Sequence, residues 1–308
     1  MTKTVQESLS AGWPAKGVAG FLHFAGFRYW PASLLPALVG TTLPFWLRPP
    51  SFSFRWLGAI EFLFATVLFH SGFSFLQAWF EERPIAEGAR SWLLVCAGMC
   101  IVLACLLGLH LNSGLRLNEF VHESIFILYG LAALVVGVLY VVPPLNFCRR
   151  VGGEIVISEG LGLIPVLGAY IIQTGDLTRA VYVASLPLVV ATGLWVWIDE
   201  LVRRTDDDKA GRKTMVILFG PRFSGRFVVL ALSMLLFATI LLAVATASIV
   251  PLTLITLLLV GLVWRIVAVS WNEYLDSERM LEVRKKVFVL HFAIGSIIAA
   301  SSLVAQLT

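Results

Sequence analysis

Long apolar stretches separated by short polar connections run through the whole chain. Each of nine stretches is close to the ~20 residues that an α-helix needs to cross a hydrocarbon core of about 30 Å. The pattern therefore predicts an all-α, polytopic membrane protein, with a single integral membrane domain over residues 1–308. The predicted spans cover residues 30–48, 57–80, 92–111, 122–142, 154–173, 179–200, 224–247, 249–271 and 286–306.

The composition agrees with a chain whose surface faces lipid. Of its 308 residues, 58% are hydrophobic and 14% are charged, so most of the surface cannot face water. The net charge is +4, but the basic residues lie between apolar runs and form no patch interleaved with aromatic residues. Membrane lipid is therefore an expected partner, and nucleic acid is not.

The distribution of lysine and arginine predicts the orientation of the chain in the cell membrane, because these residues are retained on the cytoplasmic side of short connections. With a cytoplasmic N-terminus, 19 of the 23 lysine and arginine residues lie on the cytoplasmic side. We therefore expect residues 1–27 to be an N-terminal cytoplasmic segment, residues 81–91 and 199–223 to be cytoplasmic loops, and the C-terminus to lie opposite. The four basic residues on the other side are Arg48, Arg55, Arg116 and Arg179.

One predicted span carries a polar stripe. His70, Ser74, Gln77 and Glu81 are separated by four, three and four residues, which places them on one face of a helix. Polar groups at membrane depth are costly unless they line a water-filled cavity or find partners. The stripe therefore predicts a cavity, and the alternative is hydrogen bonding between packed helices.

A second polar cluster follows the sixth span. Asp199 and Glu200 end that span, Arg203 follows, and the connection after the fourth span contributes Arg149 and Arg150. Carboxylates beside guanidinium groups suit a magnesium-bound phosphate, because arginine supplies forked donors and carboxylates hold the metal. A diphosphate headgroup with an apolar tail inside the bundle would use both features. The alternative is a solvated connector that fixes topology.

Two segments carry a resemblance to a known family. Residues 28–46, RYWPASLLPALVGTTLPFW, and residues 140–175, with their tyrosine, double proline, Gly-Glu and Gly-x-Tyr elements, resemble the UbiA-type intramembrane prenyltransferases. The likeness is greatest to the menaquinone-type branch, which prenylates dihydroxynaphthoate. It implies about nine helices around a lipid-open cavity, capped by two cytoplasmic loops whose aspartate motifs hold magnesium and a prenyl diphosphate.

The second aspartate motif of that family reads D-x-x-x-D-x-x-x-G-x-x-T. Its second aspartate, glycine and threonine fall on Asp207, Gly211 and Thr214, whereas Arg203 stands where the first aspartate is expected. A register that uses Asp208 instead breaks the spacing to the glycine.

The first motif, N-x-x-x-D-x-x-x-D, falls on Ser74, Ala78 and Glu82, with Gln77 and Glu81 beside it. Alanine cannot ligate a metal, and serine is a poor substitute for an asparagine carbonyl. The remaining acids therefore leave ligands for one magnesium ion rather than two. The resemblance implies metal ligation by Glu81, Glu82 and Asp207, and catalytic roles for Asp207, Asp208 and Glu81.

Further roles follow from the same resemblance. The expected partners are a prenyl diphosphate and a small aromatic or quinone-like acceptor. The residues expected to bind the diphosphate are Arg149, Arg150, Arg203, Arg204, Arg212 and Lys213. Those expected to line the cavity are His70, Ser74, Gln77, Tyr140 and Glu159.

Three functions are open at this point. The first is transfer of a prenyl group from its diphosphate to a small aromatic or quinone-precursor acceptor. The second is an intramembrane terpene cyclase, in which the prenyl cation is attacked by its own double bond. The third is a non-catalytic family member that binds an isoprenoid or quinone.

Overall fold

The computed structural model describes residues 18–48, 52–81, 87–114 and 120–307. Within these residues the secondary structure is helical, and no β-strand is formed. The α-helices are α2 (Val18–Phe24), α3 (Pro31–Thr42), α4 (Pro44–Leu47), α5 (Trp56–Phe80), α6 (Glu87–Gly114), α7 (Phe120–Val141), α8 (Gly153–Gly162), α9 (Ile164–Thr174), α10 (Arg179–Lys209), α11 (Met215–Phe223), α12 (Val229–Ala245), α13 (Val260–Asn272) and α14 (Ser277–Val304). Three 3₁₀-helices and one π-helix join them. The 3₁₀-helices are η1 (Phe27–Tyr29), η2 (Phe147–Arg149) and η4 (Pro251–Leu259), and the π-helix is η3 (Ser224–Val228).

The predicted all-α membrane architecture is confirmed. In the described residues, seven helical segments are long and apolar enough to cross a membrane, and two shorter apolar segments, Pro31–Leu47 and Ile125–Val141, account for the other predicted spans. The fifth span is broken between α8 and α9, where Pro165 lies in the first turn of α9. A proline has no N–H to donate to the preceding turn, so it begins a helix more readily than it continues one.

The structure differs from the sequence expectation over residues 199–223. That segment was expected to be a loop, but α10 continues to Lys209 and α11 follows after a short turn. Asp199 and Arg203 are one helical turn apart and form an ion pair of 2.7 Å, which supports the continued helix. A segment with both acidic and basic residues, 199–209, thus continues the helix beyond the apolar span.

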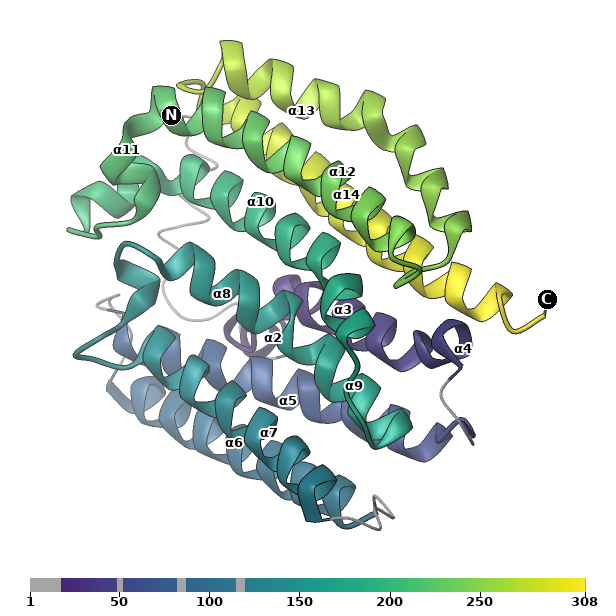
Figure 1. Cartoon of the computed structure of the whole chain (residues 1–308). Coiled ribbons are helices and arrows are strands. Elements are labelled where there is room, and N and C mark those ends of the chain that lie inside the picture. The colour runs from purple at the N-terminus through teal and green to yellow at the C-terminus, as the bar shows by residue number, and fades with distance from the viewer. Residues whose placement is uncertain (1–17, 49–51, 82–86, 115–119, 308) are drawn as a thin grey trace.

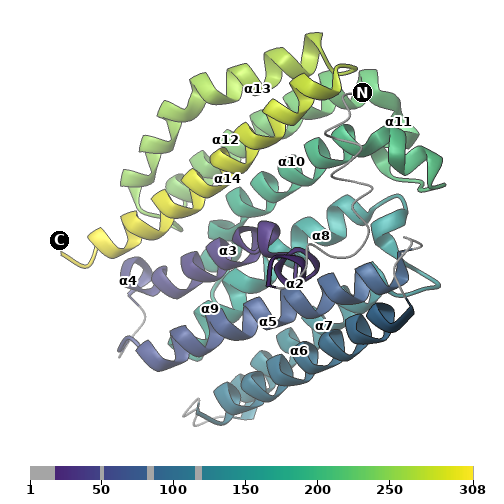
Figure 2. The same ribbon diagram turned by 180° about the vertical axis from the view of Figure 1, so that it is seen from behind.

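The helices form layers that follow the long axis of α10 (Figures 1 and 2). Helices α5, α6 and α7 lie on one side of the molecule, and α12, α13 and α14 lie on the other. Helix α10 lies between them and packs against α8, α12 and α14.

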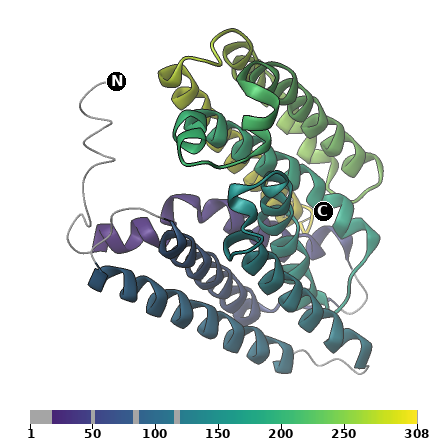
Figure 3. The ribbon, with the colours of Figure 1, turned by 90° about the vertical axis from the view of Figure 1, so that its left-hand side faces the viewer.

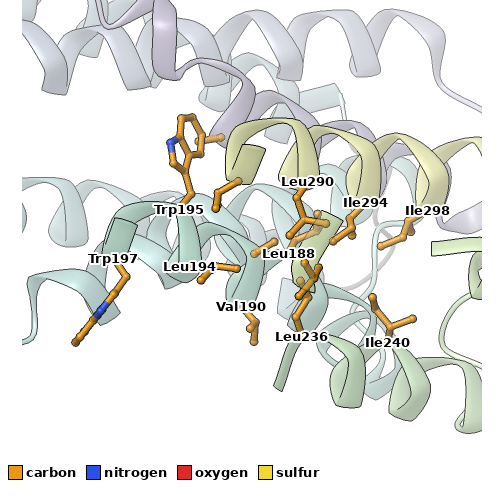
Figure 4. Packing of buried hydrophobic residues seen from close by; sticks show 14 of the residues in the cluster. Leu188, Val190, Leu194, Trp195, Trp197, Leu236, Ile240, Leu290, Ile294 and Ile298 are labelled. Carbon is orange, nitrogen blue, oxygen red and sulfur yellow. The ribbon is translucent and has the colours of Figure 1, made fainter. Parts of the chain in front are cut away.

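The main core is built around α10. Figure 4 shows Leu188 and Leu194 of α10 together with Leu236 of α12 and Leu290 and Ile294 of α14, all of which are buried. Lipid tails are as apolar as leucine, so close packing rather than escape from water holds such helices together. The core therefore fixes the position of α10.

One end of the bundle gathers the connections that carry charge. Figure 3 looks onto this end, where α5, α7 and α10 finish and α8 and α11 begin. The backbone N–H of Lys213 donates to the carbonyl of Arg149 at 2.8 Å, and the Arg149 guanidinium donates to the carbonyl of Ala210 at 3.1 Å. These bonds attach the connection after α7 to the connection after α10.

Candidate active site

A cavity of about 540 Å³ lies between the layers. Its walls are largely apolar and aromatic, with Phe62 and Phe69 from α5 and Trp195 from α10. One part of the lining is charged and comes from the C-terminal half of α10 and the turn after it. The charged residues of the lining are Asp199, Glu200, Arg203, Asp207 and Arg212.

The polar stripe of α5 faces this cavity. His70, Ser74 and Gln77 belong to its lining, as does Tyr140 of α7. The Nδ1 atom of His70 lies 3.0 Å from the Ser33 hydroxyl of α3, in hydrogen-bonding contact. The stripe thus combines the two sequence interpretations, because it lines a cavity and also bonds to another helix.

The turn after α10 directs Arg212 back toward the cavity. Gly211 has a φ of +67°, and its N–H donates to the carbonyl of Asp208 at 3.0 Å. The N–H of Arg212 donates to the carbonyl of Asp207 at 2.9 Å. Together these bonds form a Schellman motif, in which the left-handed residue is usually glycine. The glycine of the sequence motif therefore ends the helix and reverses the chain.

Arg212 joins the ends of α5 and α10. Its Nη2 atom lies 3.0 Å from Glu81 Oε1, and its Nη1 atom lies 3.3 Å from Asp207 Oδ1. The three side chains are largely buried, with exposed fractions of 11%, 15% and 8%. Because one guanidinium holds both carboxylates, two residues 126 positions apart are kept at one point.

Asp199 is held by two arginines. Its carboxylate lies 2.7 Å from Arg203 of the same helix and 3.2 Å from Arg284 of α14. Arg284 belongs to the basic run 284–286 and was not among the residues that the sequence assigned to the site. No spacing in the sequence connects it with Asp199, so only the packing of α14 on α10 reveals this role.

Two neutral side chains outside the spans also line the cavity. Burial raises the pKa of the Tyr29 phenol, and the neighbouring Asp199 carboxylate raises it further. Burial also raises the pKa of the Cys148 thiol, to about 11, and this thiol donates to Asn146 Oδ1 at 2.8 Å. Both groups therefore stay protonated near neutral pH, and the sequence assigned neither of them to the site.

Glu154 of α8 and Glu200 of α10 are buried carboxyl groups, and Glu200 belongs to the charged lining. Glu154 Oε1 accepts the N–H of Met215 at 2.5 Å, at the start of α11. This bond attaches α8 to the start of α11.

The chain matches the model of the UbiA prenyltransferase family over residues 33–292. This protein belongs to the UbiA prenyltransferase family. The match covers most of the 308 residues, from α3 to α14.

One characterised relative is the 1,4-dihydroxy-2-naphthoate octaprenyltransferase of Bacillus subtilis (strain 168). It is 30% identical to this chain over 93 residues, which is 30% of this chain and 30% of the length of that protein.

Solved structures share the UbiA fold with this chain. A digeranylgeranylglyceryl phosphate synthase is 13% identical, with a TM-score of 0.64 over 92% of this chain and 97% of the other. A UbiA homolog from Archaeoglobus fulgidus, bound to GPP and Mg²⁺, is 16% identical, with a TM-score of 0.59 over 90% of this chain and 99% of the other.

The structure places some of the residues that the UbiA resemblance implied at the cavity and others away from it. Asp207, Arg203 and Arg212 line the cavity, and Glu81 contacts Arg212. Glu82 lies outside the described residues. Six implied residues are not part of the cavity lining. Asp208, Arg150 and Lys213 are exposed, and Glu159 is half-buried on α8. Arg149 donates to the carbonyl of Ala210, and Arg204 donates to the carbonyls of Leu201 and Leu275.

The described residues do not fit a magnesium centre of the UbiA type. Magnesium requires oxygen ligands in octahedral geometry. Here Asp199, Asp207 and Glu81 are each already paired with an arginine. Over the described ranges, no three acidic, histidine or cysteine side chains converge as metal ligands. A divalent cation at any of these carboxylates would lie beside a guanidinium and be repelled by it.

Proposed function

We propose that this protein is a membrane enzyme that uses a prenyl diphosphate as donor and transfers the prenyl group to a small aromatic or quinone-precursor acceptor. The observation that carries this proposal is a single cavity whose apolar, aromatic walls adjoin two arginines, Arg203 and Arg212. An isoprenoid tail suits the apolar walls, and a diphosphate suits guanidinium donors.

In the proposed reaction, the bond between prenyl C1 and the diphosphate oxygen breaks, and the diphosphate leaves with the electron pair. An electron-rich ring carbon of the acceptor then bonds to the allylic cation, and the ring loses a proton. Arg203 and Arg212 stabilise the charge on the leaving diphosphate. Phe69, Phe73 and Trp195 offer aromatic faces to the cation.

The acceptor requires a polar position within the apolar part of the cavity. His70, held by the Ser33 hydroxyl at 3.0 Å, supplies one. A neutral imidazole can accept a hydrogen bond from an acceptor hydroxyl or take the ring proton after attack.

The relatives support the substrate classes. The Bacillus subtilis relative is named for transfer of an octaprenyl group to 1,4-dihydroxy-2-naphthoate, a quinone precursor. The Archaeoglobus fulgidus homolog was captured with DMAPP and with GPP, each together with Mg²⁺. The described residues of this chain support the same class of donor, because two arginines adjoin an apolar cavity.

The test is incubation of the purified protein with prenyl diphosphates of several chain lengths, with and without aromatic acceptors such as 1,4-dihydroxy-2-naphthoate. Diphosphate release and lipid products are both measured. We expect diphosphate release that depends on the acceptor, together with a prenylated acceptor. A cyclic hydrocarbon formed without acceptor would instead identify a terpene cyclase. Tight prenyl-diphosphate binding with no release would identify a non-catalytic protein.

A further inference from the structure

Three carboxylates at the charged part of the cavity are paired with the protein's own arginines. Three carboxylates, those of Glu81, Asp199 and Asp207, are matched by three guanidinium groups, those of Arg203, Arg212 and Arg284. A cluster of acids without arginines would need a divalent metal to balance it, but this cluster already contains its cations.

Arg203 occupies the central position of this arrangement. Asp199, Arg203 and Asp207 follow one another at intervals of four residues, so they lie along one face of α10. Arg203 is paired with Asp199 at 2.7 Å. A guanidinium therefore occupies the middle position of a helix face whose positions one turn before and one turn after are carboxylates.

Both arginines can still contact a ligand. The contacts of Arg203 with Asp199 use its Nη2 and Nε atoms, and 39% of the side chain is accessible. Since Arg203 lines the cavity, a ligand there can reach the rest of its guanidinium edge. Arg212 also lines the cavity, and 11% of its side chain is accessible. A guanidinium has five N–H donors, so it can hold a carboxylate on one edge and phosphate oxygens on another.

We propose that Arg203 and Arg212 serve as fixed cations in place of magnesium, so that this protein binds the diphosphate group without a divalent metal. The inference rests on the proposed function for the identity of the donor. It is independent of which acceptor is used, because it concerns only the leaving group. The Schellman turn at Gly211 and the ion pairs to Glu81 and Asp207 hold Arg212 in place before any ligand arrives.

The first test measures binding of inorganic pyrophosphate and of a non-hydrolysable geranyl diphosphate analogue to the purified full-length protein by calorimetry. Each titration is run in excess EDTA and again in millimolar Mg²⁺. We expect the two dissociation constants to agree within about two-fold, since a charge-assisted hydrogen bond to arginine does not involve the metal.

Variants assign the binding to the arginines. Arg203→Gln and Arg212→Gln are expected to weaken binding by roughly ten-fold or more, the usual loss when one charge-assisted hydrogen bond is removed. Arg222→Gln is the matched control, because Arg222 is an exposed arginine of α11 that is not part of the cavity lining. Equal weakening by all three variants would contradict the assignment.

The wild-type protein decides the inference without any variant. Binding that disappears in EDTA and returns with Mg²⁺ would overturn metal independence while leaving the proposed donor intact. Absence of binding under both conditions would overturn the proposed function together with the inference.

A second test places a carboxylate between Asp199 and Asp207 on the same face of α10. Arg203→Asp places three carboxylates along one face of α10, whereas Arg204→Asp makes the same charge change one residue out of register. We expect Mn²⁺, followed by electron paramagnetic resonance, to bind the Arg203→Asp protein at least ~10-fold more tightly than the wild type or the Arg204→Asp protein. Tight Mn²⁺ binding by the wild type would overturn the inference.

Discussion

At the scale of single residues, helical geometry decides which aspartate reaches the cavity. Asp207 and Asp208 are neighbours in the sequence, but successive positions on a helix point about 100° apart. Asp207 is buried and contacts Arg212 at 3.3 Å, whereas Asp208 is exposed. The motif register that keeps the glycine spacing therefore selects the aspartate that reaches the cavity.

The two aspartates are predicted to differ when each is changed to asparagine. Asp207→Asn removes the charge that holds Arg212, and we expect acceptor-dependent diphosphate release to fall by on the order of 100-fold, as when a catalytic group is displaced by about 1 Å. Asp208→Asn should change the rate by no more than about two-fold, because an exposed carboxylate interacts weakly with its surroundings. A comparable loss in both proteins, measured with equal amounts of folded protein, would refute the distinction.

At the scale of elements, several motif residues shape the ends of α10, α11 and α8. Gly211 closes the Schellman motif of α10, and the Thr214 hydroxyl accepts the N–H of Ile217 as the N-cap of α11. Gly153 at the start of α8 leaves no room for a side chain, since a Cβ there would lie 2.0 Å from the Phe147 carbonyl oxygen. These residues position the charged groups without touching a ligand.

Gly211→Ala is predicted to weaken both stability and diphosphate binding. A side chain in the left-handed region costs roughly 1–2 kcal/mol, and relief of that strain would displace Arg212. Gly211→Asn should retain most of the binding, because asparagine tolerates this conformation better. Thermal unfolding and pyrophosphate titration of the purified variants measure the two effects.

Gly98→Ala is the matched control for that substitution. Gly98 lies within α6, and an added Cβ there would meet nothing within 4 Å. We expect this change to leave pyrophosphate binding unaltered and to raise stability by about 0.4–1 kcal/mol. If Gly211→Ala behaved in the same way, the left-handed turn would have no role in placing Arg212.

At the scale of the whole molecule, the arrangement of layers creates the site. The cavity lies between α5, α6 and α7 on one side and α3, α8 and α10 on the other, so no single element contains it. The apolar core that packs α10 against α12 and α14 fixes the position of the helix that carries the charged lining (Figure 4).

The charge distribution predicts that the N-terminus and the charged end of the bundle face the cytoplasm and that the C-terminus lies on the opposite side. Green fluorescent protein fused to the N-terminus should fluoresce, and alkaline phosphatase fused after residue 308 should be active. Alkaline phosphatase fused after residue 210 should be inactive. Activity of the fusion after residue 210 would reverse the predicted orientation.

The sequence by itself determined much of the architecture. Apolar runs set by the thickness of a bilayer predicted the helices, and four-residue spacing predicted the polar face of α5. The resemblance of residues 28–46 and 140–175 predicted the UbiA family, which the family match confirms. Such features are local, because each depends on residues close together in the chain.

The tertiary structure alone decided which charges meet. The sequence placed six basic residues near a diphosphate, but only Arg203 and Arg212 of that set line the cavity. Arg284 pairs with Asp199, 85 residues away in the sequence, and Glu154 accepts the N–H of Met215, 61 residues away. Ion pairing acts over a few ångströms in space and leaves no spacing in the sequence. The arginines that balance these carboxylates became visible only when the helices were packed together.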